Sequence, residues 1–322
     1  MTEKISVIIP LYNKGPYVAR AIESVLKQTI QNFDIIVIDG GSHDDGPKSV
    51  KDFNDSRIHF IVQSGKGVSN ARNEGVHFSK NEYIAFLDAD DEWMPKHLET
   101  IQRLIEKFPK AGMFTTTYKN QTAEGKLQWA NYKCIPDAPW EGLLPDYFKS
   151  GALGAYPVWT SVVVIPRKIF HEMGGFPEGY WFGEDADLFG KIALKYKVAF
   201  SREFGGIYHY DASNRACDRK IPPDYQEPFV RTARAALMNG EVSQELTESL
   251  IDYIWKKEYD RAIRNEWTGF PNTAKTILEQ FTTKWNYKEK IKWFLFIHFS
   301  DPQYLFIRKI KRKLVNAVWK KT

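Results

Sequence analysis

The sequence lacks most features that mark secreted, membrane-spanning or zinc-binding proteins. Only two cysteines occur in 322 residues, Cys134 and Cys217. Their separation fits no metal-ligand spacing, which predicts a reduced, cytoplasmic setting. No basic stretch followed by a long apolar stretch opens the chain, so we expect no secretory signal. No run approaches the roughly 20 apolar residues of a membrane-spanning helix, and the densest late run, 293–299, is too short.

Two common nucleotide-binding motifs are also missing. No G-x-G-x-x-G follows the first predicted strand, which argues against a dinucleotide-dependent oxidoreductase. The segment GSHDDGPKS (41–49) comes near a phosphate-binding loop, but Pro47 interrupts the required Gly-Lys pair and removes a backbone N–H. No recognised nucleic-acid-binding module is present, so we expect no nucleic-acid partner.

The net charge of +5 conceals a strong asymmetry. Residues 284–322, here called the basic tail, hold 11 Lys/Arg and 2 Asp/Glu, whereas the first 283 residues hold 34 basic and 38 acidic groups. The basic tail also contains Trp, Phe, Leu and Ile. It is therefore either an amphipathic segment on an anionic membrane surface, at the inner face of the cell membrane, or a helix packed on the domain with a solvated basic face.

Alternating apolar runs and helical periodicities predict an α/β fold with a mainly parallel, Rossmann-like sheet. The predicted strands are 6–9, 35–38, 58–62, 83–87, 113–117, 161–165 and 207–210. The spacing of apolar residues predicts helices around 18–26 and 98–108, and further helices over 167–173 and 184–196. Between 119 and 158 the periodicity fades, and beyond 215 only helical patterns remain. The expected divisions are therefore 1–118, 119–215 and a helical extension, 216–322.

Polar clusters follow three of the predicted strands. They are Tyr12–Asn13, Asp39–Ser42 and Asp88–Asp91. Ligands of open α/β sheets bind outside the carboxyl ends of the strands, so we expect the three clusters to share one site. The D-x-D at Asp88 and Asp90 suits a hard divalent cation, Mg²⁺ or Mn²⁺, which binds through carboxylates together with substrate phosphates.

The motifs, taken together and in order, resemble family 2 glycosyltransferases. The matching segments are SVIIPLYN (6–13), AIESVLKQT (21–29), IIVIDGGSHDD (35–45), GVSNARNEG (67–75), EYIAFLDADDEWMP (82–95), GGFPEGYWFGEDADLFGKIA (174–193) and YHYDAS (208–213). The resemblance covers about residues 4–213. It implies a GT-A fold and an inverting, metal-dependent transfer of a sugar from a nucleotide diphosphate donor.

The resemblance also implies roles for individual residues. The donor-binding residues would be Pro10, Tyr12, Asn13, Asp39, Lys66, Arg72, Asp88, Ala89 and Asp90. Asp90 would be the principal metal ligand, with Asp88 and His209 beside it. Asp185 would be the general base, supported by Glu184, and a position at a helix N-terminus would favour its ionised form. Asp91 would cap or orient the following helix.

Several alternatives stay open at this point. Glu184 and Asp185 would serve as helix caps if they play no catalytic role. Tyr180 and Trp181, with Phe182, form either an acceptor platform or ordinary packing. Family 2 members often carry a second acid where this chain has Gly40. That second acid commonly helps to read uracil, so Gly40 weakens the expectation of a UDP-sugar donor and leaves GDP- and dTDP-sugars open.

The predicted function is transfer of a sugar to a hydroxyl of a cell-surface glycan or a lipid-linked precursor. A nucleotide-sugar-binding protein without catalysis is one alternative, but the presence of Asp88, Asp90 and Asp185 argues against it. A sugar-nucleotide pyrophosphorylase is another, but it would carry a glycine-rich basic loop where this chain reads YNKGPY (12–17).

Overall fold

The structure is a computed structural model, and it describes residues 3–122, 124–213, 215 and 219–282. The chain divides into two compact units, Met1–Lys257 and Glu258–Thr322. The basic tail lies outside the described residues, so the two predictions about it stay predictions. Among the described helices, none combines the length and the apolar character needed to cross a membrane.

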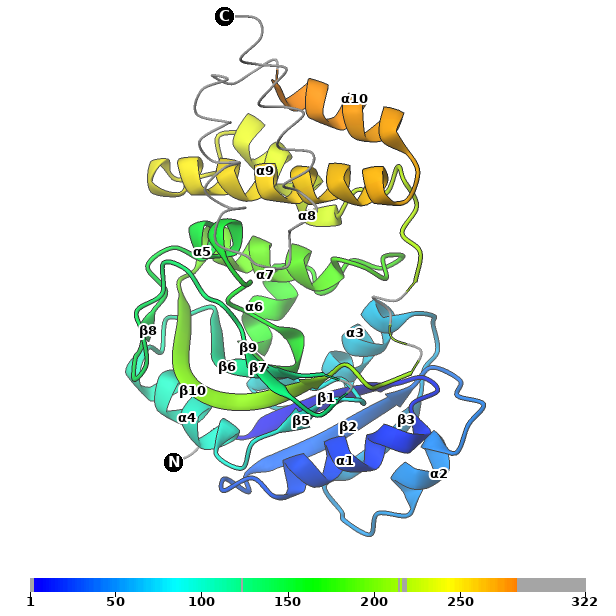
Figure 1. Ribbon diagram of the computed structural model, residues 1–322. Helices are drawn as coiled ribbons and strands as arrows, with labels where there is room; N and C mark the ends of the chain where they lie inside the picture. The colour runs from blue at the N-terminus through cyan, green and yellow to red at the C-terminus, as the bar shows by residue number, and fades with distance from the viewer. Residues whose placement is uncertain (1–2, 123, 214, 216–218, 283–322) are drawn as a thin grey trace, which may run out of the picture. The chain divides into compact units, whose positions relative to one another are not determined.

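A single mixed sheet forms the centre of the first unit (Figure 1). Its described strands run in the order β3-β2-β1-β4-β9-β6-β10-β5, with β7 beside β6 and β8 beside β10. The first four strands of the chain are parallel where they pair. Their bounds are Ile5–Leu11 for β1, Phe33–Asp39 for β2, Ile58–Val62 for β3 and Tyr83–Phe86 for β4. Because β2 and β4 flank β1 on opposite sides, the strand order reverses at β1, where α/β sheets bind ligands.

The other half of the sheet mixes strand directions. The strand β9 (Val163–Pro166) pairs antiparallel with both β4 and β6 (Met113–Gln121), and β10 (Val198–His209) runs parallel to β6. The short strand β5 (Glu92–Trp93) is antiparallel to β10. Two further short strands pair antiparallel with these: β7 (Leu127–Trp129) with β6, and β8 (Glu141–Leu143) with β10.

Helices cover both faces of this sheet, which explains why β1 is apolar almost throughout. The buried faces of α1 (Gly15–Leu26) and α4 (His97–Lys107) share one core with Ile5, Val7 and Ile9. On the opposite face lies α3 (Val68–Phe78), where a Cβ on Gly75 would stand 2.4 Å from Ile8. Figure 1 shows α1 and α2 (Gly46–Lys51) on one side of β1–β3 and α3 on the other.

The later helices of the first unit pack through aromatic rings. The ring of Phe148 in α5 (Tyr147–Leu153) stacks on Phe229 of α8 (Pro228–Met238) at 5.8 Å. Phe229 also fills the space beside Gly190 of α7 (Glu184–Lys195), where a Cβ would clash at 2.2 Å. The short helix α6 (Arg167–Glu172) directly follows β9 and lies between α5 and α7 in the sequence. The long helix α9 (Gln244–Trp267) begins in this unit.

The described part of the second unit contains the end of α9 and α10 (Pro271–Thr282). Its small apolar core consists of Ala262, Ala274 and Ile277. The helical extension that the sequence predicts after residue 215 thus begins with α8 on the first unit and continues into the second.

The predicted α/β fold with a mainly parallel sheet is confirmed, and several regions differ in detail. The helices α2 and α3 were not among the predicted helices. Residues 119–158 contain the end of β6, β7, β8 and α5, which are too short to show a periodicity in the sequence. The predicted last strand, 207–210, is the end of a longer β10 that starts at Val198. Register shifts between Ser201 and Gly206 interrupt the alternation of β10, and such irregularities disguise a strand in the sequence.

Candidate active site

The carboxyl ends of β1, β2 and β4 bring the three predicted polar clusters to one edge of the sheet. The backbone N–H of Asn13, after β1, donates to Ser42 Oγ at 3.0 Å, and the Asn13 side chain accepts from the N–H of His43 at 2.8 Å. Asn13 has a φ of 51°, which asparagine tolerates better than most residues. The first two clusters therefore form one connected corner.

Asp39 lies at the floor of this corner. It is 5% exposed, and its carboxylate accepts from the Ser42 N–H at 3.2 Å. Gly40 follows it, and a Cβ there would lie 3.0 Å from Gln63 Oε1 and 3.5 Å from the Tyr12 ring. Gln63 donates to Asn70 and to the Gly67 carbonyl. An amide from the end of β3 thus stands beside Gly40, where the resemblance led us to expect a second acid.

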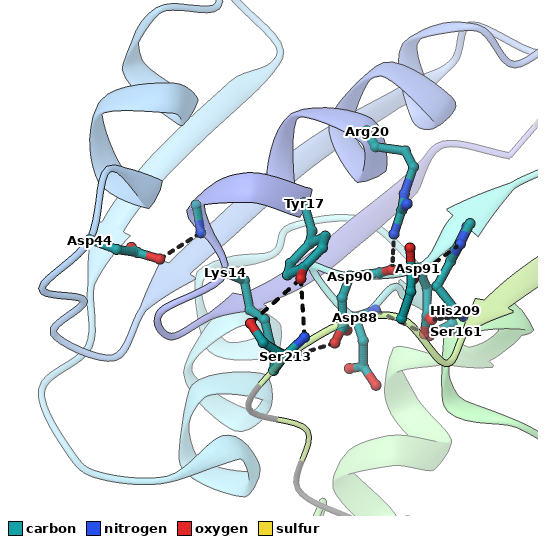
Figure 2. A network of polar contacts seen from close by, with 12 residues as sticks. Lys14, Tyr17, Arg20, Asp44, Asp88, Asp90, Asp91, Ser161, His209 and Ser213 are labelled. Carbon is teal, nitrogen blue, oxygen red and sulfur yellow. Dashed lines mark hydrogen bonds and ion pairs between the residues drawn. The ribbon is translucent and has the colours of Figure 1, made fainter. Parts of the chain in front are cut away.

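The D-x-D follows β4, and its middle residue is buried whereas its two acids are partly exposed. Ala89 is 2% exposed and belongs to the core beneath α1. The side chains of Asp88 and Asp90 are 28% and 16% exposed. Asp90 Oδ2 accepts from Lys14 Nζ at 2.6 Å, and the Asp90 carbonyl accepts from Arg20 at 2.5 Å (Figure 2).

Asp91 does not cap the following helix, and that part of its prediction is wrong. The N-cap of α4 is Lys96, which has no side-chain capping bond. Asp91 is fully buried and accepts from Ser161 Oγ at 2.5 Å and from the His209 N–H at 3.4 Å (Figure 2). Burial raises its pKa well above the usual value, and the charges of Asp90 and Asp88 raise it further. The strand β5 separates Asp91 from α4, and Asp91 instead links the D-x-D to the turn before β9, through Ser161, and to the end of β10, through His209.

Arg72 of α3 connects the D-x-D to the second pair of acids. Its guanidinium is 4% exposed and donates to Asp88 Oδ1 at 2.7 Å and to Glu184 Oε1 at 2.9 Å. Burial opposes the charge of Arg72, but Asp88 and Glu184 outweigh burial and raise its pKa. One arginine therefore holds acids from the two predicted halves of the domain in a fixed relation.

Glu184 and Asp185 begin α7, but neither of them occupies the N-cap. The N-cap residue is Gly183, with a φ of 76° in the left-handed region that favours glycine. Glu184 turns to Arg72, whereas Asp185 Oδ1 accepts from the Ala186 N–H at 2.7 Å and Oδ2 accepts from Thr160 at 3.3 Å. Asp185 is half-buried, so one carboxylate at the edge of the network remains accessible.

The raised pKa of Glu184 should make the stability of the protein depend on pH. Burial and the charge of Asp185 raise its pKa to about 7, against the attraction of Arg72, which is shared with Asp88. The folded chain then keeps a proton that the unfolded chain releases above about pH 4.5. The free energy of unfolding should therefore fall as pH rises from about 4.5 to 7.

Replacing Glu184 removes this titration. Relative to wild type, the melting temperature of Glu184→Gln should rise between pH 5 and pH 8, as measured by thermal denaturation. Glu106→Gln, on the exposed side of α4, is the control and should show no such trend. If the difference in melting temperature between wild type and Glu184→Gln stays constant from pH 5 to pH 8, the raised pKa of Glu184 is contradicted.

Among the described residues, no three His, Cys, Asp or Glu side chains converge where a metal ion could sit. Asp88 and Asp90 still fit a divalent cation, because such ions often bind one or two carboxylates and complete their shell with substrate phosphates. His209 Nε2 lies 3.2 Å from Glu92, and its buried Nδ1 has no hydrogen-bond partner and lies 3.9 Å from Asp211. An imidazole whose Nε2 donates to Glu92 presents the lone pair of Nδ1, which suits a ligand.

The aromatic residues before α7 pack on one another. Tyr225 donates to the Phe182 carbonyl at 2.5 Å, and its ring lies 6.1 Å from Trp181 and 6.5 Å from Tyr180. All four side chains are only half-buried. The contacts satisfy the packing interpretation, and the acceptor role of Tyr180 and Trp181 stays a prediction.

The other predicted donor-binding residues lie around the same edge. Tyr12 is 47% exposed after β1, Pro10 is the β1 residue that pairs with Ile38, and Lys66 is exposed in the loop between β3 and α3. The sequence reasoning missed Lys14, Arg20, Thr160 and Ser161, which contact the acids directly. Lys14 could have been found, because it is a cation in the short loop after β1, at the same edge of the sheet as the D-x-D.

The sheet with a strand reversal at β1, and with acids at its carboxyl edge, is the GT-A fold of glycosyltransferases. The chain belongs to glycosyl transferase family 2, whose sequence pattern matches residues 6–166. GlyG, a glycosyltransferase of Streptococcus pneumoniae serotype 4, is 28% identical over 65% of this chain and 71% of its own length. An uncharacterized glycosyltransferase of Nostoc sp. is 35% identical over 67% of this chain and 70% of its own. The predicted family is confirmed.

Solved structures agree on the fold. Residues 1–349 of Staphylococcus aureus TarS, crystallised in complex with UDP-GlcNAc, superpose with a TM-score of 0.60 at 16% identity over 88% of this chain and 93% of that one. The predicted GT-A fold is therefore confirmed as well. Three glycosyltransferases of Rickettsia species are much longer, and the chain spans only 26% to 31% of their length.

Proposed function

We propose that this glycosyltransferase moves a sugar from a nucleotide-diphosphate-sugar to an acceptor hydroxyl by metal-assisted, inverting single displacement. One observation carries the proposal. Arg72 binds both Asp88 of the D-x-D and Glu184 of the acid pair. Donor and base functions would therefore lie within a single network, as a single displacement requires.

The chain's own residues supply the parts of the reaction. Asp185 takes the proton of the acceptor hydroxyl, whose oxygen attacks the anomeric carbon of the donor sugar. The bond from that carbon to the diphosphate oxygen breaks, and its electron pair leaves with the nucleoside diphosphate. Attack from the side opposite the leaving group inverts the anomeric configuration. Thr160 and the Ala186 N–H hold the Asp185 carboxylate in place.

Asp90 and Asp88 are the residues that would hold Mg²⁺ or Mn²⁺, with His209 as the third proposed ligand, although the three side chains do not converge on one point in the described residues. The ion would supply Lewis-acid stabilisation of the leaving diphosphate. Support comes from the partial exposure of both carboxylates and from the unpartnered Nδ1 of His209.

The donor is proposed to be a UDP-sugar. Asp39, with Arg72 and Lys66, would contact the nucleoside, and Tyr12 would lie beside the base. The TarS structure with UDP-GlcNAc favours a uridine nucleotide, whereas Gly40 leaves GDP- and dTDP-sugars as the alternatives. Gln63, next to Gly40, offers an amide that can both donate and accept hydrogen bonds.

The acceptor is proposed to be a glycan or a lipid-linked precursor of the cell surface, with Tyr180 and Trp181 as its platform. Sugars present apolar C–H faces that half-buried aromatic rings can cover. The proposed setting is the cytoplasm, with peripheral attachment to an anionic membrane through the basic tail. The composition of residues 284–322 supports this attachment.

The proposal is tested by incubating the purified chain with UDP-, GDP- and dTDP-sugars, with and without Mn²⁺. We expect one class of donor to stabilise the protein against heating and to be hydrolysed slowly when Mn²⁺ is present. A chain that binds and hydrolyses none of these donors would refute the proposed function. Binding without hydrolysis under every condition would favour the non-catalytic alternative.

The replacement Asp90→Asn tests the D-x-D. Because it removes the charge that attracts the cation, metal-dependent donor hydrolysis should fall at least about 100-fold, a loss of roughly 3 kcal/mol in transition-state stabilisation. Thermal melting should show a folded protein, and Mn²⁺ affinity, measured by electron paramagnetic resonance, should fall in parallel. Full activity in Asp90→Asn would remove the D-x-D from the mechanism.

A further inference from the structure

Lys14 holds a position that the catalytic scheme above does not use. It lies three residues after the end of β1 and immediately before α1, and its side chain is only 12% exposed. The ammonium donates to Asp90 Oδ2 at 2.6 Å and to the Ser213 carbonyl at 2.8 Å. In Figure 2 the side chain reaches from the start of α1 to both the D-x-D and the segment after β10. Lys14 therefore neutralises the carboxylate on which the proposed metal site depends.

The segment after β10 is attached to α1 by a second residue. The Tyr17 hydroxyl accepts from the Ser213 N–H at 3.1 Å (Figure 2), and its hydrogen bonds with the Ser213 hydroxyl and with this N–H lower the pKa of Tyr17. Lys14 and Tyr17, at the start of α1, thus both form hydrogen bonds with Ser213. The ammonium of Lys14 is therefore hydrogen-bonded to one charged group, the Asp90 carboxylate, and to one neutral group, the Ser213 carbonyl.

Lys14 and a divalent cation would compete for Oδ2 of Asp90. A lysine ammonium at 2.6 Å from Oδ2 occupies the space that a divalent ion bound to that oxygen needs, and the two positive charges repel each other. A diphosphate resolves the conflict, because its negative oxygens can lie between the two cations. Lysine is suited to this exchange, since its ammonium is a point charge on a flexible stem.

We propose that Lys14 is a substrate-contacting catalytic residue that leaves Asp90 and binds the diphosphate of the donor. In the donor-free protein it acts as a built-in counter-ion of the D-x-D. With donor bound, it neutralises charge on the leaving nucleoside diphosphate when the bond to the anomeric carbon breaks. This inference rests on the proposed function, because it takes the diphosphate to lie at Asp90.

The proposal makes opposite predictions for metal and for nucleotide. Replacing Lys14 by methionine removes a competitor for Asp90, so Mn²⁺ alone should bind at least threefold more tightly. The same replacement removes a phosphate contact, so a nucleoside diphosphate in the presence of Mn²⁺ should bind at least tenfold more weakly. A residue with a purely structural role would not shift the two affinities in opposite directions.

The experiment uses the full chain and four variants, Lys14→Met, Lys14→Arg, Lys27→Met and Tyr17→Phe. Mn²⁺ binding is followed by electron paramagnetic resonance, and binding of UDP, GDP and dTDP with Mn²⁺ by titration calorimetry. Lys27→Met is the matched control, because Lys27 ends the same helix in an exposed pair with Glu23 at 2.8 Å and should leave both affinities unchanged. Tyr17→Phe removes the Ser213 contact and keeps the pair of Lys14 with Asp90, so its Mn²⁺ affinity should equal that of wild type.

The outcomes separate the two proposals. Opposite shifts in Lys14→Met, with neither shift in Lys27→Met, support the role of Lys14. If wild type binds a nucleoside diphosphate and Lys14→Met binds it equally well, the role of Lys14 is refuted and the proposed function stands. If wild type binds none of the three nucleotides, both proposals fall. Lys14→Arg keeps the charge and should retain most of the nucleotide affinity.

Discussion

Asp185→Asn should lower the rate of sugar transfer by about 10²- to 10⁴-fold, the usual contribution of a general base. The amide of asparagine cannot take the proton from the hydroxyl of the acceptor at neutral pH. It has the same shape as the carboxylate and therefore preserves the contact with Thr160. Donor binding should change less than about twofold, since Asp185 lies outside the D-x-D. The measurement is kcat for transfer beside the dissociation constant of the nucleotide.

Asp34→Asn provides the control for this variant. Asp34 lies at the start of β2, at the other end of the strand from Asp39, and pairs with Lys4. It should leave transfer and donor binding unchanged. Unimpaired transfer by Asp185→Asn would exclude Asp185 as the base, and a parallel loss of donor binding would place it in the donor site.

Arg72→Met should have the largest effect on stability. Removal of the guanidinium leaves Glu184, which is 8% exposed, without its partner and frees Asp88 as well. Breaking a buried ion pair on one side costs about 3–5 kcal/mol. Thermal melting should therefore begin on the order of 10 °C lower in a unit of this size. Donor hydrolysis should fall too, because Asp88 and Glu184 lose their common anchor.

The destabilisation should depend on pH in a definite direction. Below about pH 7 the raised pKa of Glu184 allows it to take up a proton, which relieves the unpaired charge. The loss in melting temperature should then be smaller at pH 5.5 than at pH 8. Arg57→Met is the control, since Arg57 pairs with Asp55 in a partly exposed position. It should cost about 1 kcal/mol or less, and an equal cost in both variants would contradict the role of Arg72.

The two strongest predictions meet at one structural feature. Arg72 is on a helix of the first predicted half, and Asp185 is on α7 of the second. Glu184 stands between them, bound to Arg72 and adjacent in sequence to the base. A change in this network should therefore alter chemistry and folding together, whereas a change at Asp185 alone should alter chemistry.

The positions of most strands and of most acids along the chain could be predicted because they depend on local sequence. A buried parallel strand is a short apolar run, and its carboxyl end is marked by the first polar residues. That rule placed Asp39, Asp88 and Asp90 at one edge. The roles of Lys14 and Asp91 did not follow, because their partners Ser213, Ser161 and His209 are 70 to 199 residues distant in the chain.

The sequence by itself therefore determined the family, the α/β fold and the edge of the sheet where the site lies, since each is written in short segments with a period or a motif. It could not decide what each charged group is bonded to. The three aspartates of YIAFLDADDEW (83–93) look equivalent in sequence, yet Asp88 binds Arg72, Asp90 binds Lys14, and Asp91 is fully buried and accepts from Ser161. Only the tertiary structure distinguishes them, because the free energy of a charge depends on its burial and on partners brought close by the fold.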